Sequence, residues 1–588
     1  MKVKRARALA ALMLCWAGCK GTLTGDGPPG TDPGDPTTPV EPTEPWTPPG
    51  GGVTVDPSLF PDASCRPEVA RIWALTPEQL EATYASVIEG FPQGIVDTAL
   101  RPYVGRGEPY SNDPAILNGG PQYMSRLIGS VGALVDRSIS DERVEGPPCI
   151  GTDDASCRDT LLSAFASTLY RRELTAEERD AHVSFYDAIA AAQGAGAANR
   201  LLARRLLTAP TVIFREELGG EPGDDSLAVL TPRERADLLS YTLLDAPPDD
   251  ELTAAAADGT LADPAVLEAQ VRRLVGLVPE DVTLEDAQDE RSITGIMRFF
   301  YEWLDVEDIR FAEGLRFEDN GAERNLRWLS NEPMMFVREV LWNNDARLET
   351  LLNANFTMYS RTLSDYYGRA EREAPSPSPT LQGRRGLLMQ GGWLISHKGI
   401  TARGVWIREK LFCQEVPSPP GVDMNLTGLE EDLEVEEGRD LSPREVRERH
   451  MSEPSCQNCH AVIDPLGYPF DGFATNGTPR EDVEGFPLEL EGWIESTANT
   501  DGAVSGPQEL VATLARSPDV RGCFVEQLYG YVHGRHIAEH DTCYVDGLKA
   551  RFEETDGDIR DLIVQIFLLE NMTRRVPFSA LLTEEDSP

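Results

Sequence analysis

The stretch Leu230-Thr231-Pro232-Arg233-Glu234 indicates which class of fold this chain adopts. A threonine hydroxyl here caps the first turn of a helix, and the glutamate three residues later caps the backbone of the threonine in return. Proline fits the first helical position, because its missing N–H would have no partner there. Capping boxes of this kind, each after a leucine, occur at three other places: Thr76–Gln79, Thr175–Glu178 and Ser442–Glu445. We therefore predict a helix after each of the four boxes.

Helical spacing also dominates the apolar residues. In the segment 559–567 they recur at intervals that place them on one face of a buried helix: Ile559, Leu562, Ile563, Ile566 and Phe567. Strand signals are few, and the weak alternation of residues 488–496 predicts only a short hairpin arm. The sequence therefore predicts a mostly α, multidomain helical protein with at most a short β hairpin.

The segment Cys456-Gln457-Asn458-Cys459-His460 has the form C-x-x-C-H, the attachment signature of haem c. Two thiols one helical turn apart would each form a thioether to a porphyrin vinyl group, and the histidine would supply the fifth iron ligand. We therefore expect one covalent haem c in a small cytochrome-c-like segment, bound through Cys456, Cys459 and His460. The segment at Pro465 is expected to turn back and offer a backbone carbonyl to Nδ1 of the histidine.

Two other interpretations of this motif stay open. Without haem, Cys456 and Cys459 would form a structural disulfide beside a surface histidine. A zinc site is less favoured, because no second C-x-x-C or H-x-x-x-H pair lies nearby. The motif also leaves the sixth iron ligand open, and His397 and His450 are the candidate metal ligands upstream of it. The thioether alternatives upstream are Met389, Met424 and Met451.

A second group of histidines lies near the C-terminus, at His533, His536 and His540. Their spacing is compatible with one helix face, but Gly534 is typical of the residue just past a helix end. We therefore favour loop histidines over a metal site here.

The N-terminus carries an export signal. A basic start is followed by a short apolar run and then by Ala17-Gly18-Cys19, which is similar to a bacterial lipoprotein processing site. We expect residues 1–19 to be the signal peptide and Cys19 to be lipidated, although ordinary secretion is the alternative. Residues 20–55 are rich in Pro, Gly and Thr and would form a disordered tether. The expected location is the outer membrane, facing the periplasm or the cell surface.

Charge and cysteine content limit the partners and the compartment. The formal net charge of −44 argues against nucleic acid or an anionic membrane as a partner. Contact with a membrane is thus expected only through the lipid anchor. Six cysteines remain outside the signal, the anchor and the motif, and three disulfides fit an oxidising compartment. Six cysteines allow 15 pairings, of which Cys149–Cys157 and Cys523–Cys543 are favoured because they close short loops.

Turn-rich stretches divide the rest of the chain. We expect an N-terminal helical domain at 56–222, a central helical domain at 223–373, a haem c motif domain at 381–498 and a C-terminal helical domain at 503–585.

Five segments carry a resemblance to a known family. They are L-T-P-R-E-R-A-D-L-L-S-Y at 230–241, R-R-G-L-L at 384–388, R-G-V-W-I-R-E at 403–409, C-Q-N-C-H-A-V-I-D-P at 456–465 and Y-V-H-G-R at 531–535. With them the chain resembles a planctomycete-type family of exported, uncharacterised multidomain proteins, catalogued as DUF1592, DUF1588, DUF1585 and DUF1595. The family usually has an acid where this chain has Ala474. The resemblance implies a modular helical protein with a cytochrome-type segment, and it supplies no reaction.

The expected function is electron transfer at the bacterial cell envelope, with a redox protein or a small-molecule electron donor or acceptor as partner. A haem-dependent oxidoreductase or peroxidase-like enzyme is one alternative. A haem-free binding or structural envelope lipoprotein is another. No catalytic residue is assigned, and whether the protein is an enzyme is left open.

Overall fold

Helices begin at all four predicted capping boxes. In this computed structural model, Thr76, Thr175 and Thr231 each exchange two hydrogen bonds with the residue three positions on. These boxes open helices α1 (Pro77–Ala85), α5 (Ala176–Gln193) and α8 (Pro232–Leu244). Ser442 and Glu445 make the same pair of bonds before α18 (Pro443–Met451). The prediction of four capped helices is therefore confirmed.

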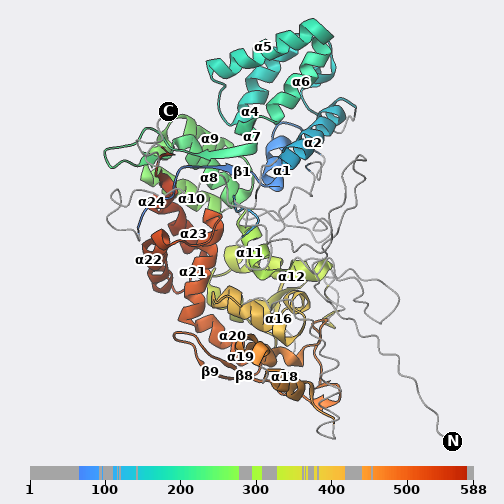
Figure 1. Ribbon diagram of the computed structural model, residues 1–588, viewed down its shortest axis with the longest axis vertical. Coiled ribbons are helices and arrows are strands. Elements are labelled where there is room, and N and C mark those ends of the chain that lie inside the picture. The colour runs from blue at the N-terminus through green and yellow to red at the C-terminus, as the bar shows by residue number, and fades with distance from the viewer. Residues whose placement is uncertain are drawn as a thin grey trace, which may run out of the picture. The chain divides into compact units, whose positions relative to one another are not determined.

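The structure describes residues 65–91, 96, 110–114, 117, 121–140, 144–276, 295–306, 327–359, 363, 366–368, 376–379, 383–416, 440–451 and 454–578. All of them belong to one unit, residues 55–588 (Figure 1). The lipidation site expected at Cys19, the signal and the tether lie outside the described residues.

Helices make up most of the described chain. Besides those that the capping boxes open, the α-helices of the first half are α2 (Pro121–Ser140), α3 (Cys157–Thr160), α4 (Ala166–Tyr170), α6 (Ala195–Leu207), α7 (Pro210–Ile213), α9 (Asp250–Ala257), α10 (Pro264–Gly276) and α11 (Ile296–Leu304). In the second half they are α12 (Arg327–Arg338), α13 (Leu348–Asn353), α15 (Gly391–Ser396), α16 (Gly399–Trp406), α19 (Pro454–Gly467), α20 (Pro507–Arg516), α21 (Pro518–His533), α22 (Thr542–Glu554), α23 (Ile559–Leu568) and α24 (Glu570–Thr573). The mostly α fold class is confirmed.

Strands within the described residues form only short antiparallel pairs. The pair of β8 (Glu491–Ile494) with β9 (Gly502–Ser505) contains the hairpin arm that was predicted at 488–496. The structure adds four pairs: β1 (Arg71–Ala74) with β2 (Phe214–Glu217), β3 (Ala228–Val229) with β10 (Arg574–Arg575), β4 (Phe356–Tyr359) with β5 (Ser376–Pro379), and β6 (Asp482–Val483) with β7 (Phe486–Pro487). The strands of these four pairs are two to four residues long, at or below the shortest run from which alternation predicts a strand.

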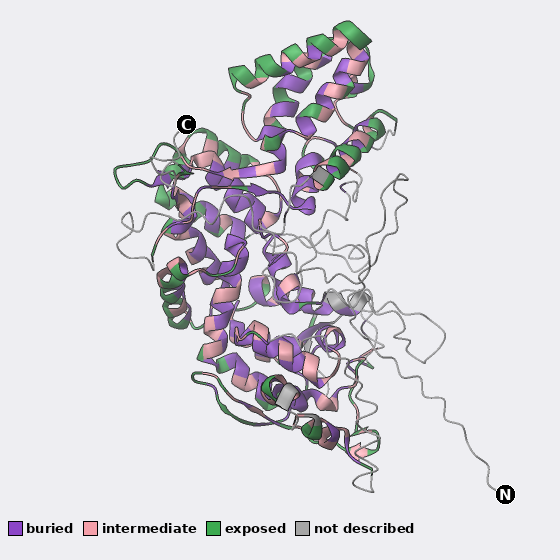
Figure 2. Ribbon diagram, viewed as in Figure 1, coloured by how far each residue is buried: buried purple, intermediate pink, exposed green. Residues whose placement is uncertain are grey.

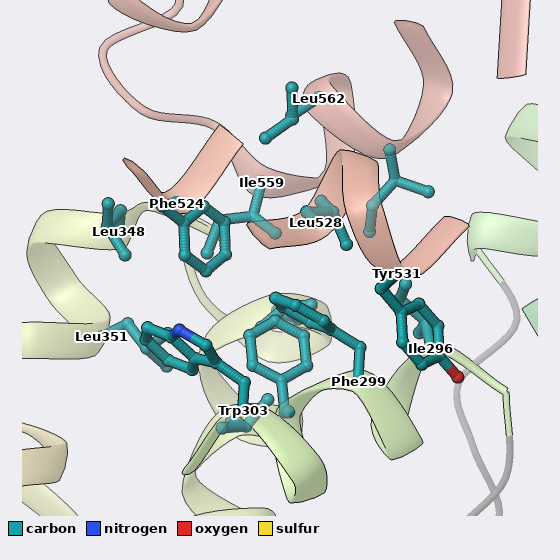
Figure 3. Packing of buried hydrophobic residues seen from close by; sticks show 14 of the residues in the cluster. Ile296, Phe299, Trp303, Leu348, Leu351, Phe524, Leu528, Tyr531, Ile559 and Leu562 are labelled. Carbon is teal, nitrogen blue, oxygen red and sulfur yellow. The ribbon is translucent and has the colours of Figure 1, made fainter. Parts of the chain in front are cut away.

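Two large apolar clusters form most of the core of the described chain. The smaller one lies in the N-terminal part and holds residues from α1, α2 and α4 to α7. The larger one runs from α8 to α24 and includes α19. Figure 3 shows its centre, where Ile296, Phe299 and Trp303 of α11 face Phe524 and Leu528 of α21. The predicted apolar face of the segment 559–567 is buried here as α23.

Helix α8 lies between the two clusters. Nearly every side chain along it is buried, as Figure 2 shows by its purple colour. Tyr241 belongs to the smaller cluster, while Leu238 and Leu239 on the same helix belong to the larger one. The larger cluster combines residues from the central, haem-motif and C-terminal segments, whose domain boundaries stay predictions.

The C-terminal segment returns to the start of the described chain. Strand β10 pairs with β3, and Val576 forms a bridge with Val69. Disulfides join Cys65 to Cys543, Cys149 to Cys157 and Cys413 to Cys523. The predicted Cys149–Cys157 pair is therefore confirmed. The predicted Cys523–Cys543 pair is wrong, because the fold brings a distant partner to each of these two cysteines.

Candidate functional site

The C-x-x-C-H motif lies on one helix, α19, near its N-terminus. Positions three and four apart share one face of a helix, so Cys456, Cys459 and His460 lie along the same side. All three are partly exposed, whereas Ile463 and Leu466 further along the helix are buried. The three residues therefore lie at the partly exposed N-terminal end of a helix face that continues into the core at Ile463.

Glycines let the backbone of α19 approach its neighbours closely. A methyl group on Gly404 of α16 would overlap the carbonyl oxygen of Ile463, and one on Gly467 would overlap that of Ile400. On another side, a methyl group on Gly492 of β8 would overlap the carbonyl oxygen of Pro465. The motif helix is thus held between α16 and β8 by backbone contacts that only glycine permits.

Buried arginines fix the same region through backbone carbonyls. Arg403 of α16 donates to the carbonyl oxygens of His397 (3.0 Å) and Phe470 (2.9 Å). Arg408 donates to the carbonyl oxygen of Val462 in α19, at 2.6 Å. Burial lowers the pKa of Arg403 to about 10, and it also lowers the pKa of Arg408. The R-G-x-x-x-R segment therefore serves to support the motif helix.

His460 is oriented by a side chain of its own helix. Its Nδ1 lies 3.0 Å from Oδ2 of Asp464, one turn further along α19. The other carboxylate oxygen of Asp464 accepts from Oγ1 of Thr401 in α16, at 2.8 Å. Because an ionised carboxylate only accepts, the Nδ1–H of His460 is the donor, so Nε2 is the ring nitrogen that would ligate a metal.

This geometry corrects the expectation of a backbone carbonyl from the segment at Pro465. Helix α19 continues through Pro465 to Gly467, so the chain does not turn back at the proline. Sequence reasoning missed Asp464 and Thr401. The spacing of four residues between His460 and Asp464 is the signal that could have identified the aspartate.

His397, a candidate sixth ligand, lies in the core. Its ring packs against Trp393 and Trp406, at centroid distances of 4.8 and 5.7 Å. Its Nε2 is 2.9 Å from the carbonyl oxygen of Leu304, and burial lowers its pKa. Iron ligation by Nε2 would require this hydrogen bond to break.

The structure leaves the other upstream candidates largely untested. His450 lies in the last turn of α18, but its side chain is outside the described part. Met424 is outside the described residues too, Met451 is half-buried, and Met389 is fully buried.

The C-terminal histidines are not all in a loop. Gly534 does end α21 in the left-handed conformation, as predicted. His533, however, is buried in the last turn of the helix, and its ring stacks on Tyr529 with 3.8 Å between centroids. Burial and the nearby Arg535 lower the pKa of His533 to about 3. His536 is exposed, and His540 approaches Glu68 to 4.0 Å.

The residues of the motif fit haem c. They supply two sulfurs for thioether bonds and an imidazole that is oriented through its Nδ1, all on one helix face. Among the described residues, no three His, Cys, Asp or Glu side chains form a cluster suited to a metal ion. None of the described helices is long and apolar enough to cross a membrane.

Three family models match the chain in order, and each is described as a protein of unknown function. They are DUF1592 at residues 230–368, DUF1588 at 384–483 and DUF1585 at 501–569. The chain therefore belongs to a family of uncharacterised multidomain proteins, and helix α19 lies within the DUF1588 match. The DUF1595 domain stays a prediction. Neither a curated protein nor a solved structure matches the chain significantly.

Proposed function

We propose that this chain is an exported c-type haem protein that transfers single electrons at the bacterial cell envelope. Thioethers from Cys456 and Cys459 would hold the haem, and His460 would ligate its iron. The observation that carries this proposal is that α19 places the three residues on one helix face. A bound haem supplies one-electron redox chemistry, which no protein side chain at this site provides.

The packing of α19 suits that role. Backbone contacts with α16 and β8 and the hydrogen bond from Arg408 restrict the motion of the helix. A rigidly held ligand reorganises little when the charge of the site changes, and preorganised groups avoid that energetic cost. The partner would be a redox protein or a small-molecule electron donor or acceptor.

The N-terminus supports a location at the envelope. The basic and apolar start followed by Ala17-Gly18-Cys19 favours export and lipidation of Cys19. A tether at residues 20–55 would then connect the lipid to the folded part. We place the protein as an outer membrane lipoprotein that faces the periplasm or the cell surface.

The test is a pyridine haemochrome spectrum of the full chain, exported by a bacterium with haem-ligation machinery. We expect one covalent haem c per chain in the wild type and none in Cys456→Ala/Cys459→Ala. His536→Ala, which changes an exposed histidine, should keep the haem. Colourless wild-type protein would overturn the proposal and favour the haem-free lipoprotein.

A haem-dependent oxidoreductase is the second candidate, and the Asp464 carboxylate favours it. A carboxylate behind a ligating histidine makes the ligand more basic, which suits a haem that activates a small molecule. Binding of cyanide to the ferric protein, seen as a shift of the Soret band, would indicate an accessible sixth position. An unchanged spectrum at saturating cyanide would favour electron transfer.

A further inference from the structure

We infer that Asp464 and Thr401 are positioning residues that together set the electron density on His460: the Asp464 carboxylate lowers the reduction potential of the haem, and the Thr401 hydroxyl limits that effect. The inference rests on the proposed haem site. It adds what the C-x-x-C-H motif does not contain, namely the group behind the histidine and the residue that controls that group.

The first step is geometric. The Asp464 side chain is 2% exposed and lies between His460 on its own helix and Thr401 on α16. Each carboxylate oxygen has one of these partners, at 3.0 Å and 2.8 Å. The contact between α16 and α19 at Gly404 brings Thr401 within reach of Asp464. The carboxylate is therefore fixed in place by two helices.

The second step concerns charge. Among the described residues, no lysine or arginine forms an ion pair with Asp464. Arg403 and Arg408, the buried arginines of α16 and the segment after it, donate instead to backbone carbonyls, including those of His397 and Val462. Burial and then the charge of Asp464 raise the pKa of Tyr468. Within the described part of the chain, the Asp464 carboxylate thus faces the imidazole without an ion-paired lysine or arginine.

The third step links the charge to the iron. A carboxylate that accepts from Nδ1–H gives the histidine partial imidazolate character and raises its basicity as a ligand. Ferric iron carries one more positive charge than ferrous iron, so a more electron-rich ligand stabilises the ferric state and lowers the reduction potential. Thr401 acts in the opposite sense, because its hydroxyl withdraws part of the carboxylate charge.

Opposite effects of two substitutions provide the test. In redox titrations of the haem-loaded full chain, Asp464→Asn should raise the reduction potential by at least about 59 mV, a tenfold change in the ferrous-to-ferric ratio. Thr401→Val should lower the potential. Asp471→Asn, which changes an acid that pairs with Arg480, is the matched control and should leave it unchanged.

Several outcomes would overturn the inference. One is an Asp464→Asn variant with the reduction potential of the wild type. Another is a shift of the same sign in Asp464→Asn and Thr401→Val, which would indicate general disruption of the site. Wild-type protein without haem would instead refute the proposed site.

A second measurement needs no haem and no stable variant at Asp464. In ¹⁵N NMR of the haem-free wild-type chain, His460 should be the Nδ1–H tautomer, with its signals assigned from His460→Gln. The Nε2–H tautomer in the wild type would refute the hydrogen bond on which the inference depends.

Discussion

Cys65 forms a disulfide with Cys543, although 478 positions separate the two in the sequence. Around this bond the start of the described chain lies against its C-terminal part. Arg535 donates to Glu68, the backbone of Arg66 bonds to the carbonyl oxygen of His540, and Val69 forms a bridge with Val576. The two ends of the folded part therefore support each other.

Removing this disulfide should lower stability. For Cys65→Ala/Cys543→Ala we expect a loss of about 2 to 5 kcal/mol in the free energy of unfolding, because the bond closes a long loop. We expect a smaller loss of the free energy of unfolding for Cys149→Ala/Cys157→Ala, because that disulfide closes a loop of only 8 positions. Urea denaturation measures both. Peptide mapping without reduction should recover Cys65–Cys543 and Cys413–Cys523, and a Cys523–Cys543 peptide would contradict the structure.

His533 should make stability depend on pH. Its pKa is lowered to about 3 in the folded protein, from 6.5, by burial and by Arg535. The unfolded chain therefore binds a proton that the folded chain does not bind between these values, so stability falls as the pH drops from 6.5 towards 3. The slope from one such group is up to about 1.4 kcal/mol per pH unit.

Denaturation of His533→Phe across this pH range should show a shallower decline than the wild type. The exposed His536→Phe should follow the wild type. Parallel curves for His533→Phe and the wild type would show that His533 titrates normally.

Glu217 should be essential to the fold. Its carboxylate is buried between Arg71, at 2.8 Å, and Arg575. Removing one partner of a buried ion pair typically costs about 3 to 5 kcal/mol, because a buried charge is left uncompensated. We expect a loss of this order for Glu217→Ala in urea denaturation. We expect Glu216→Ala to lower the free energy of unfolding by at most about 1 kcal/mol, because Glu216 pairs with Arg233 at the surface.

The same carboxylate should contribute to acid denaturation. Burial raises the pKa of Glu217, but Arg71, Arg575 and Arg215 outweigh it and hold the pKa well below 4.5. The stabilisation is thus present above pH 4.5 and is lost as the pH falls further. The free energies of unfolding of the wild type and Glu217→Ala should therefore converge at low pH. A difference between them that stays constant with pH would contradict this.

Gly404→Ala should disrupt the haem site. An added methyl group would overlap the carbonyl oxygen of Ile463, so α16 and α19 would have to separate. We expect strong destabilisation and little covalent haem after export, measured by denaturation and by haem stain. Gly129→Ala is the matched control, because Gly129 lies in helix α2 with nothing near the added atom. It should be neutral or stabilising by up to about 1 kcal/mol.

Local patterns predicted the local structure well. The capping boxes at Thr76, Thr175, Thr231 and Ser442 open helices because both partners of each box are close in sequence. The apolar spacing of 559–567 identified α23 for the same reason. The loop between Cys149 and Cys157 is short enough that proximity alone indicated the bond.

Disulfides between distant cysteines could not be predicted from local patterns. Cys413 and Cys543 lie 110 and 478 positions from their partners, and only the folded chain brings each pair together. His533 was expected in a loop, yet it is buried in the last turn of α21. The side chain of Arg71, at the start of β1, donates to the carbonyl oxygen of His533.

The sequence by itself determined that the chain is mostly helical, where its capped helices start, and that two cysteines and a histidine share one helix face. These properties follow from backbone hydrogen bonding and helix periodicity over a few residues. Only the tertiary structure decided that Thr401 holds the second oxygen of the Asp464 carboxylate behind that histidine. This arrangement requires two helices to touch at Gly404, and contact between helices depends on the shape of surfaces assembled from distant parts of the chain.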